Sequence, residues 1–474
     1  MKTFIPINFL FYDYETFGIN PIFDKPSQFA CVRTDYNFKI ISNPVVLYCY
    51  PPIDYLPDPN AVLITSITPQ YTRKFGLNES NFSKKINFIF NKYSNTCILG
   101  FNNICFDDEI TRNIFYRNFF DSYEWSWKNN NTRWDVLNLM RAFYALRPDG
   151  INWPINKKKI VSFKLSHLTK INNLSHYKAH DALSDVYATI NLLKLMKLKN
   201  LKFFNFLFFI RKKKNLLILI KKNFFTPLIF ISSIFGSKNN NIGYVIPLII
   251  HEKNKNILIV FDLNKYYCFD IFIKKYEKNF NFDLKVLFKL GMKLIYLNKC
   301  PILIPFSVLR KEDILRLNLD KNKIFKNFIF FKNFFCFERI NNLSKIIFKD
   351  KKYNHIDESL YKSFFSYSDK KKIHSFRNLI NNNIINNNLD IYDKRFNDLL
   401  FFFQARNFPY TLNKKNKYIW KKYLIKFFNK EKIFFYKKNI IDLKKKYFND
   451  SKKLNLLKDL LEYLKYLIKN IKKI

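Results

Sequence analysis

Residues 8–18 read NFLFYDYETFG, an apolar run that ends in acidic residues and a turn. A run rich in aromatic residues and bounded by a glycine is typical of a buried β-strand. Side chains of a strand point to the same face at every second residue, so Asp13 and Glu15 share a face. Two like charges on one face are unfavourable without a cation, and carboxylate oxygens are ligands that suit Mg²⁺ or Mn²⁺. The pair alone is weak evidence, because most such pairs are solvent-facing strand residues.

The segments that follow predict an α/β domain. Further strands are expected at residues 30–34 and 45–50, and together with the first strand they resemble an antiparallel meander. Helices are expected at residues 68–75 and 80–90, which have Thr or Ser near their starts. A short buried strand at residues 97–101 precedes another helix from about Asp108.

An apolar stripe at helical spacing predicts a helix that begins near His180 and closes the first domain near residue 200. From about residue 202 to 350 the segments are short and rich in β-forming residues, which predicts a mixed, partly barrelled domain. The Asn-rich stretch 381–388 predicts a loop. After Asp357 the periodicity becomes helical, and residues 444–474 predict one basic amphipathic helix. Its basic side is either a solvated face over a core stripe or a polyanion-binding face.

The composition describes a folded chain with an uneven charge distribution. The 474 residues carry 82 Lys and Arg against 37 Asp and Glu, a net charge of +45, and 48% are hydrophobic, which excludes a disordered or collagen-like chain. Residues 1–150 hold 15 basic and 14 acidic side chains, whereas residues 201–474 hold 58 and 21. This surplus indicates a polyanionic partner. Compositional drift towards Lys, Asn, Ile and Phe explains part of the excess of basic residues. It does not explain why the first 150 residues have almost no such excess.

Targeting and redox signals point to the cytoplasm. No run reaches the roughly 18 apolar residues that a membrane span needs, since residues 203–220 are interrupted by four basic residues at 211–214. Acidic residues follow the first apolar run without a small-residue cleavage site, which argues against a signal peptide. The seven cysteines are scattered and never spaced as C-x-x-C, which indicates a reduced compartment. We therefore expect a cytoplasmic protein with no membrane partner.

Three more residues strengthen the case for a metal site. Asp107 follows the buried strand at 97–101, and Asp185 lies on the closing helix. With Asp13 and Glu15 they make four carboxylates, enough to neutralise two divalent ions about 3.5 to 4 Å apart, the arrangement that stabilises phosphodiester cleavage. His180 precedes Asp185 by five residues and is a candidate general base. A lone histidine is usually structural, but the spacing H-x-x-x-x-D favours a catalytic role.

These residues resemble those of the DEDD exonucleases, in the subgroup marked by H-x-x-x-x-D, which have a ribonuclease H-like fold. The segments 11–18, 63–70, 107–118, 134–153 and 179–189 are similar to bacterial exodeoxyribonuclease I. That family digests single-stranded DNA from the 3′ end and releases 5′-mononucleotides. Matching is dense over residues 9–190, thin over 202–350 and patchy afterwards.

The resemblance implies three domains and a metal site. The expected domains are a ribonuclease H-like exonuclease domain at 1–200, an SH3-like β-rich DNA-binding domain at 201–352 and a C-terminal α-helical domain at 353–474. Two Mg²⁺ ions, with Mn²⁺ as the alternative, would be held by Asp13, Glu15 and Asp185. Asp107 would complete the site through water, His180 would activate the nucleophile, and Glu15 would also contact substrate.

Single-strand binders combine basic residues with aromatic faces that stack on bases. The resemblance implies these substrate contacts: Arg112, Tyr123, Trp127, Arg141, Lys164, Phe206, Lys213, Asn256, Lys293, Asn298 and Lys299. Each Trp in the segment 123–141 is equally well interpreted as core. Two positions depart from the family. Lys164 stands where the family has Arg and loses the bidentate fork, and Phe206 stands where it has Tyr and loses a hydroxyl.

The leading hypothesis is metal-dependent, 3′ to 5′ hydrolysis of single-stranded DNA by a monomer that acts in DNA repair and recombination. Family members can contact single-strand DNA-binding protein through its acidic tail, which the basic surface permits. One alternative is an exoribonuclease or a proofreading subunit, although a small RNA-digesting enzyme would need only the first 200 residues. The other alternative is a non-catalytic single-strand binding protein, which would bind DNA without releasing nucleotides.

Overall fold

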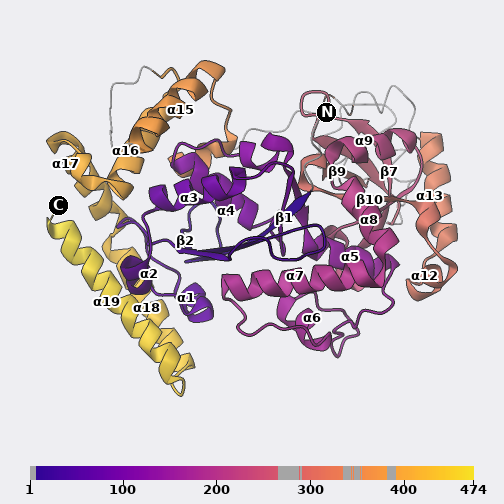
Figure 1. Cartoon of the computed structure of the whole chain (residues 1–474), viewed down its shortest axis with the longest axis horizontal. Helices are drawn as coiled ribbons and strands as arrows, with labels where there is room; N and C mark the ends of the chain where they lie inside the picture. The colour runs from indigo at the N-terminus through magenta and orange to yellow at the C-terminus, as the bar shows by residue number, and fades with distance from the viewer. Residues whose placement is uncertain are drawn as a thin grey trace. The chain divides into compact units, whose positions relative to one another are not determined.

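The computed structural model divides the chain into two compact units (Figure 1). It describes residues 7–264, 291–334, 355–381 and 391–473, together with positions 288, 343, 345 and 353. Unit 1 comprises Met1–Asn131, Tyr177–Tyr187 and Lys351–Ile474, and unit 2 comprises Thr132–His176 and Ala188–Asp350. Each unit is therefore built from segments that lie far apart in the sequence.

The expected meander is confirmed in unit 1. Strands β1 (Asn8–Thr16), β2 (Pro26–Thr34) and β3 (Val45–Tyr48) pair antiparallel in sequence order. Strand β4 (Thr96–Gly100), close to the strand expected at 97–101, pairs parallel with β1. The unit 1 strands thus run in the order β3-β2-β1-β4, with β1 in the interior. Their mixed directions and intervening helices confirm the α/β class.

Two helices cover one face of this sheet (Figure 1). Helices α3 (Glu79–Asn91) and α4 (Asp107–Arg117) contribute Phe82, Phe90 and Ile114 to a core that also holds Tyr12 and Phe29 of the sheet. Phe82, Ile86 and Phe90 lie four residues apart, so they form one apolar stripe, as expected of a helix that packs on a sheet. The packing of α3 and α4 on the sheet holds β1 in place. Asp13 and Glu15 lie near the carboxyl end of this strand.

The remaining helices of the first 131 residues begin with side-chain caps. Helix α1 (Pro59–Thr65) is capped by Asp58, and α2 (Pro69–Phe75) by Thr68, with proline in the first turn of each. Short 3₁₀ turns η1 (Glu124–Ser126) and η2 (Lys128–Asn130) follow α4. The helix expected at 68–75 is α2, and the one expected at 80–90 is α3.

The segment after Asp357 is helical, as expected. Its elements are η7 (Ile356–Tyr361), α15 (Tyr367–Asn381), α16 (Arg395–Asn407), η8 (Pro409–Thr411), α17 (Lys414–Phe427), α18 (Lys430–Lys446) and α19 (Ser451–Lys473). The Asn-rich loop prediction falls mainly on residues outside the described ones.

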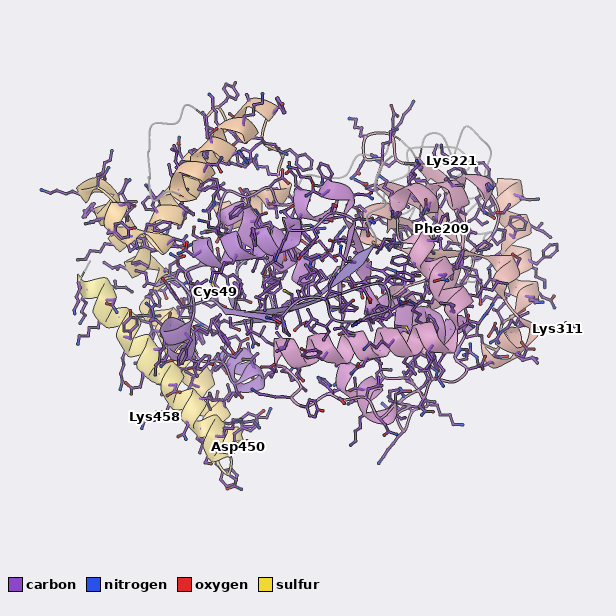
Figure 2. The ribbon with its side chains drawn as sticks, viewed as in Figure 1. Cys49, Phe209, Lys221, Lys311, Asp450 and Lys458 are labelled. Atoms are coloured by element: carbon purple, nitrogen blue, oxygen red, sulfur yellow. The ribbon has the colours of Figure 1, made fainter. Side chains whose placement is uncertain are left out.

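The expectation of one helix over 444–474 is wrong. Helix α18 ends at Lys446, and α19 starts after Asp450, whose side chain accepts a hydrogen bond from the Lys453 backbone N–H at 3.0 Å (Figure 2). This cap begins a new helix. Leucines of α19, such as Leu457 and Leu460, are fully buried against α1 and α18, while Lys458 between them is exposed. The apolar stripe of the tail is therefore confirmed as core, and the role of its exposed basic face stays a prediction.

Unit 2 combines a second sheet with helices. Its described elements include β5 (Thr132–Asp135), α5 (Val136–Leu146), α6 (Leu165–Ile171), the larger part of α7 (Ala182–Lys199), α8 (Leu201–Ile210), α9 (Lys213–Lys222), β6 (Leu228–Ile231), η3 (Ser233–Phe235), η4 (Ser237–Asn239), β7 (Ile242–Ile250), β8 (Ile257–Asp262), β9 (Met292–Tyr296), η5 (Leu297–Lys299), β10 (Ile302–Pro305), η6 (Phe306–Val308), α12 (Lys311–Arg316) and α13 (Lys321–Phe334). The five strands β10-β6-β7-β8-β9 pair antiparallel in that order.

The β-rich interpretation of residues 202–350 needs a correction at both ends. Residues 201–222 form α8 and α9, in which Phe203, Leu207 and Ile210 are buried at helical spacing. Helices α12 and α13 follow the sheet. Among the described residues, none of the helices is both long enough and apolar enough to cross a membrane.

Candidate active site

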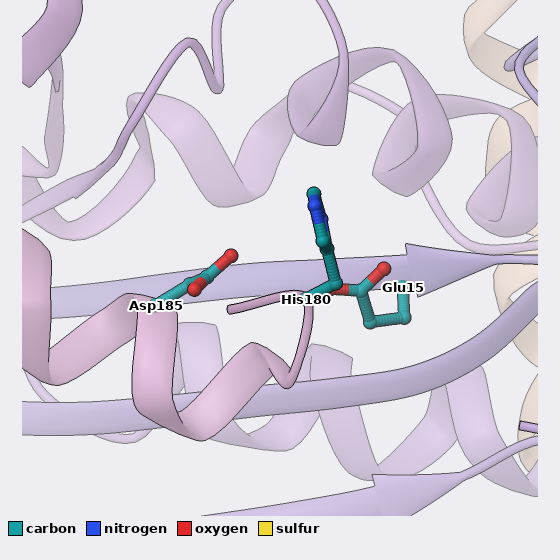
Figure 3. A group of neighbouring side chains, drawn as sticks. All are labelled: Glu15, His180 and Asp185. Carbon is teal, nitrogen blue, oxygen red and sulfur yellow. The ribbon is translucent and has the colours of Figure 1, made fainter. Parts of the chain in front are cut away.

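Side chains from two segments that lie far apart in the sequence, Glu15 in one and His180 and Asp185 in the other, meet in unit 1 (Figure 3). One ligand atom each of Glu15, His180 and Asp185 lies within 4.8 Å of the other two. Glu15 comes from β1 and is 8% exposed, His180 precedes α7 and is exposed, and Asp185 lies on the first turn of α7. The cluster thus sits between a rigid strand and the beginning of a helix.

Strand β2 anchors the start of α7 to this place. Gln28 lies opposite Glu15 in the β1–β2 register. Its side-chain oxygen accepts a hydrogen bond from the Ala182 backbone N–H at 3.1 Å, and its amide donates to Asp181 at 3.4 Å. Asp181 in turn accepts from the Ser184 backbone N–H at 3.2 Å, as a helix cap does. These bonds fix His180 and Asp185 relative to Glu15.

His180 has a left-handed backbone conformation, with φ of 63°. A residue with a Cβ rarely adopts this conformation, and it persists only where the surroundings enforce it. The enforced turn lets His180 reach the carboxylate cluster although it lies outside the helix.

Asp107, at the first position of α4, is attached to the same strand. Its Oδ1 accepts a hydrogen bond from the backbone N–H of Tyr14 at 2.9 Å. The adjacent Asp108 is fully buried and instead accepts from the Tyr12 hydroxyl at 2.5 Å. The two neighbouring aspartates therefore have different roles. Asp107 faces the carboxylate cluster, and Asp108 bonds α4 to Tyr12 in the core.

The cluster is electrostatically unfavourable without a cation. Burial, followed by the charges of Asp185 and Asp107, raises the pKa of Glu15 to about 8. Burial and the charges of Asp107, Glu15 and Asp185 also raise the pKa of Asp13 well above its usual value. A divalent cation among hard oxygen ligands would reverse both effects, so these residues fit such an ion.

Two charged residues near the cluster were missed by the sequence analysis. The charge of Asp181 raises the pKa of both Asp13 and Glu15, and Lys178 is the neighbour that lowers the pKa of Glu15. Both flank His180 in the segment 178–181. The sequence pattern D-x-x-S at Asp181 could have identified this residue, because it is typical of the residue that caps the start of a helix.

The predicted DNA contacts of unit 1 lie together at α4 and η1. The Arg112 guanidinium lies over the Tyr123 ring at 5.7 Å and is hydrogen-bonded to Glu109 at 2.6 Å. Trp127 is 60% exposed, whereas Trp125 and Trp134 are buried core residues. Trp125 and Trp134 are therefore core residues, and of the three only Trp127 is accessible for stacking.

The other predicted contacts belong to unit 2, where the structure brings one pair together. The Lys213 ammonium donates to the Asn256 side-chain oxygen at 2.6 Å, and burial lowers the pKa of Lys213. Lys293 pairs with Asp262 at 3.4 Å. The others are placed as follows: Lys164 is exposed before α6, Arg141 is half-buried and bonded to Asn138, Phe206 is half-buried on α8, the Asn298 carbonyl accepts from Arg133, and Lys299 is exposed with its ammonium 5.8 Å from the Tyr296 ring.

Family models match the chain in three consecutive segments. The model described as "Exonuclease" matches residues 10–193, "Exonuclease I SH3-like domain" matches 211–345, and "Exonuclease I C-terminal domain" matches 354–467. Exodeoxyribonuclease I of Buchnera aphidicola from Schizaphis graminum is 50% identical over 99% of this chain and 96% of its own length. Exodeoxyribonuclease I of Escherichia coli K12 is 40% identical over 97% and 98%.

Solved structures of exonuclease I, two of them from E. coli, match nearly the whole chain. A complex with a dA16 oligonucleotide has a TM-score of 0.87 at 39% identity and covers 97% of this chain and 99% of its own. A zinc-bound form of a complex of ExoI with single-stranded DNA has a TM-score of 0.88, and an SSB/exonuclease I complex with the inhibitor CFAM has 0.87; both are 39% identical and cover 98% of this chain and 100% of their own.

Proposed function

This chain belongs to the exodeoxyribonuclease I family, and we propose that it hydrolyses single-stranded DNA from the 3′ end to 5′-mononucleotides. The observation that carries the proposal is the meeting of Glu15, His180 and Asp185 within 4.8 Å. A strand, a capped helix and a strained turn hold this group, so it is prearranged for chemistry.

Two divalent cations fit the donor set. Asp13, Glu15 and Asp185 would hold them, with Asp107 completing the set through water. When bound, they would neutralise the carboxylates and stabilise charge on the attacking and leaving oxygens. Mg²⁺ is the proposed ion and Mn²⁺ the alternative; a zinc-bound form of an E. coli ExoI complex with single-stranded DNA supports binding of a divalent metal.

His180 is the proposed general base. It accepts a proton from the attacking water as the new phosphorus–oxygen bond forms, and the bond from phosphorus to the 3′ oxygen of the penultimate nucleotide breaks. The departing 3′ oxygen takes up a proton, and the released nucleotide keeps the phosphate on its 5′ oxygen. The exposure of His180 suits this role, because the proton can pass on to solvent.

The proposed contacts extend over both units. Arg112, Tyr123 and Trp127 would bind the strand from unit 1, and Lys164 and the Lys213–Asn256 pair from unit 2. The remaining proposed contacts are Arg141, Phe206, Lys293, Asn298 and Lys299. The proposed domain boundaries are 1–200, 201–352 and 353–474, which the matched segments support.

We also propose a cytoplasmic monomer that acts in DNA repair and recombination and binds single-strand DNA-binding protein. The solved SSB/exonuclease I complex supports that partner. The net charge of +45 would favour both the DNA and an acidic protein tail.

The test is hydrolysis of single-stranded DNA oligonucleotides labelled at the 3′ or the 5′ end. With Mg²⁺, the protein should release labelled mononucleotide at once from the 3′-labelled strand, and Asp185→Ala or chelation should abolish release. Asp442→Asn, which changes an exposed carboxylate on α18, is the matched control. Equal rates on matched RNA would favour the exoribonuclease, and binding without release would favour the non-catalytic binding protein.

A further inference from the structure

A cavity of about 610 Å³ in unit 1 has no part in the proposed chemistry. Residues 23–25 and 54–56 contribute to its wall from the N-terminal part of the unit, and His355 with residues of η7, α16, α17 and α18 contribute from the C-terminal part. None of the described residues that line it belongs to the catalytic group or to the proposed DNA contacts. Its volume is in the range of roughly 300 to 1,000 Å³ that is typical of pockets for small molecules.

Two buried acidic residues of the cavity wall are paired with cations of the same wall. The Arg406 guanidinium donates to Asp54 at 2.9 Å and to Asp357 at 3.0 Å. The Lys25 ammonium lies 3.7 Å from the Asp357 carboxylate. These two carboxylates therefore have ionic partners that do not include the other lysines of the cavity.

Those other lysines, Lys426 on α17 and Lys432 on α18, lack an ionic partner. Lys426 is exposed and Lys432 is half-buried. Among the described residues, neither ammonium is paired with a carboxylate, and that of Lys432 lies 3.1 Å from the centre of the Phe427 ring. Burial lowers the pKa of Lys432 to about 8. Burial of a cation without a counter-ion is unfavourable, so an anion beside these two lysines would be stabilised.

The wall next to these lysines is aromatic. Phe23, Tyr423 and Phe427 line the cavity, and Phe23 is 39% exposed. The rings of Tyr423 and Phe427 are stacked, with their centres 6.1 Å apart and their planes at 28°. Aromatic faces favour contact with another planar ring, which an inorganic anion does not have. A molecule that joins a planar base to a phosphate group matches both the rings and the lysines.

We propose that this cavity binds a nucleoside 5′-monophosphate, with the base against Tyr423 and Phe427 and the phosphate against Lys426 and Lys432. The proposed hydrolysis of DNA releases molecules of this kind, so the choice of this ligand rests on the proposed function. The cavity is then a second site for the product, apart from the catalytic group.

The test measures binding of deoxyadenosine 5′-monophosphate by isothermal titration calorimetry, in chelator so that no metal recruits the nucleotide to the catalytic group. The test variant is Lys426→Ala with Lys432→Ala. The control is Lys417→Ala with Lys437→Ala, which removes two exposed lysines of the same two helices that do not line the cavity. Both variants lose the same charge, and thermal unfolding checks that both are folded.

The wild type and the control should bind the nucleotide equally well. The test variant should lose at least about tenfold in affinity, because two charge-assisted contacts with the phosphate are removed. Inorganic phosphate should bind the wild type at least about tenfold more weakly than the nucleotide, since it has no base to stack on the rings. Phe427→Leu should weaken binding of the nucleotide more than binding of inorganic phosphate.

The possible failures can be told apart. Equal affinities of wild type and test variant for the nucleotide would overturn the site. Equal affinities of the wild type for the nucleotide and for inorganic phosphate would also overturn it, because the rings would then recognise no base. Weaker binding of an oligothymidylate of about 16 nucleotides by the test variant, with nucleotide binding unchanged, would assign the two lysines to the DNA strand instead. Absence of nucleotide release from DNA by the wild type would overturn the proposed function, while the binding comparison in chelator would still test the site.

Discussion

Replacing Glu15 by Gln should abolish catalysis and yet stabilise the metal-free protein at alkaline pH. Glu15 is 8% exposed, and its pKa is raised from 4.5 to about 8, first by burial and then by Asp185 and Asp107. The folded state therefore binds this proton more tightly than the unfolded state. The contribution of Glu15 to stability is therefore highest below about pH 4.5 and falls as the pH rises towards about 8, where the carboxylate ionises in the folded protein.

The size of the effect follows from the two pKa values. At about 1.4 kcal/mol per pH unit, full ionisation of Glu15 corresponds to about 5 kcal/mol, and roughly 4 kcal/mol of this is lost by about pH 8. Gln does not ionise, so Glu15→Gln should unfold at a higher urea concentration than wild type at pH 8. The two proteins should differ little near pH 4.5. Asp13 remains in the variant and keeps part of the pH dependence.

The assay is urea unfolding in chelator at several pH values between these limits, followed by circular dichroism. Glu462→Gln, which changes an exposed glutamate on α19, should show the pH dependence of wild type. Added Mg²⁺ should stabilise wild type more than Glu15→Gln. Parallel pH profiles for wild type and Glu15→Gln would refute the reasoning, because they would mean that this carboxylate is not strained.

Three further predictions test other parts of the molecule. His180→Ala should lower the single-turnover rate by about 10² to 10⁴-fold, with the exposed His167→Ala as control, and a full rate would exclude a base at this position. Lys164→Arg should lower KM for single-stranded DNA about two- to tenfold by adding a bidentate phosphate contact, whereas Lys170→Arg should leave KM unchanged. Arg406→Met should lower the free energy of unfolding by about 3 to 5 kcal/mol. Arg406 bonds Asp54 at 2.9 Å and Asp357 at 3.0 Å, and the substitution leaves both buried charges without this partner. The same thermal unfolding temperature as the surface control Lys415→Met would contradict this.

Local patterns predicted the first part of the fold well. The strand β1, the meander that follows and helices α2 and α3 have the period, caps and turn residues that define such elements on their own. The segment 201–222 was predicted to be rich in strands because Phe and Ile are common in strands. Its helical form depends on burial of Phe203, Leu207 and Leu216, which only the tertiary structure reveals.

The candidate site was predictable in identity but not in arrangement. Asp13 and Glu15 follow from strand periodicity, Asp107 from its place after a buried strand, and His180 and Asp185 from their H-x-x-x-x-D spacing, and the resemblance then assigned their roles. The bonds that assemble them are long-range, from Asp107 to Tyr14 and from Gln28 to the start of α7. Likewise, the break after α18 depends on Asp450 acting as a cap, which competes with the continuous basic pattern around it.

Because unit 1 is built from three separate segments of the chain, it cannot finish folding until the last of them has been synthesised. The Gln70 side chain donates to the backbone carbonyl of Asp459, 389 residues further along, and Leu457 and Leu460 pack with Val62 of α1. While the ribosome is still making the residues between them, the apolar side of α1 lacks the residues of α18 and α19 that complete its core cluster. Contacts of such high sequence separation slow folding, so the unit that holds the catalytic group is completed only after nearly the whole chain has been synthesised.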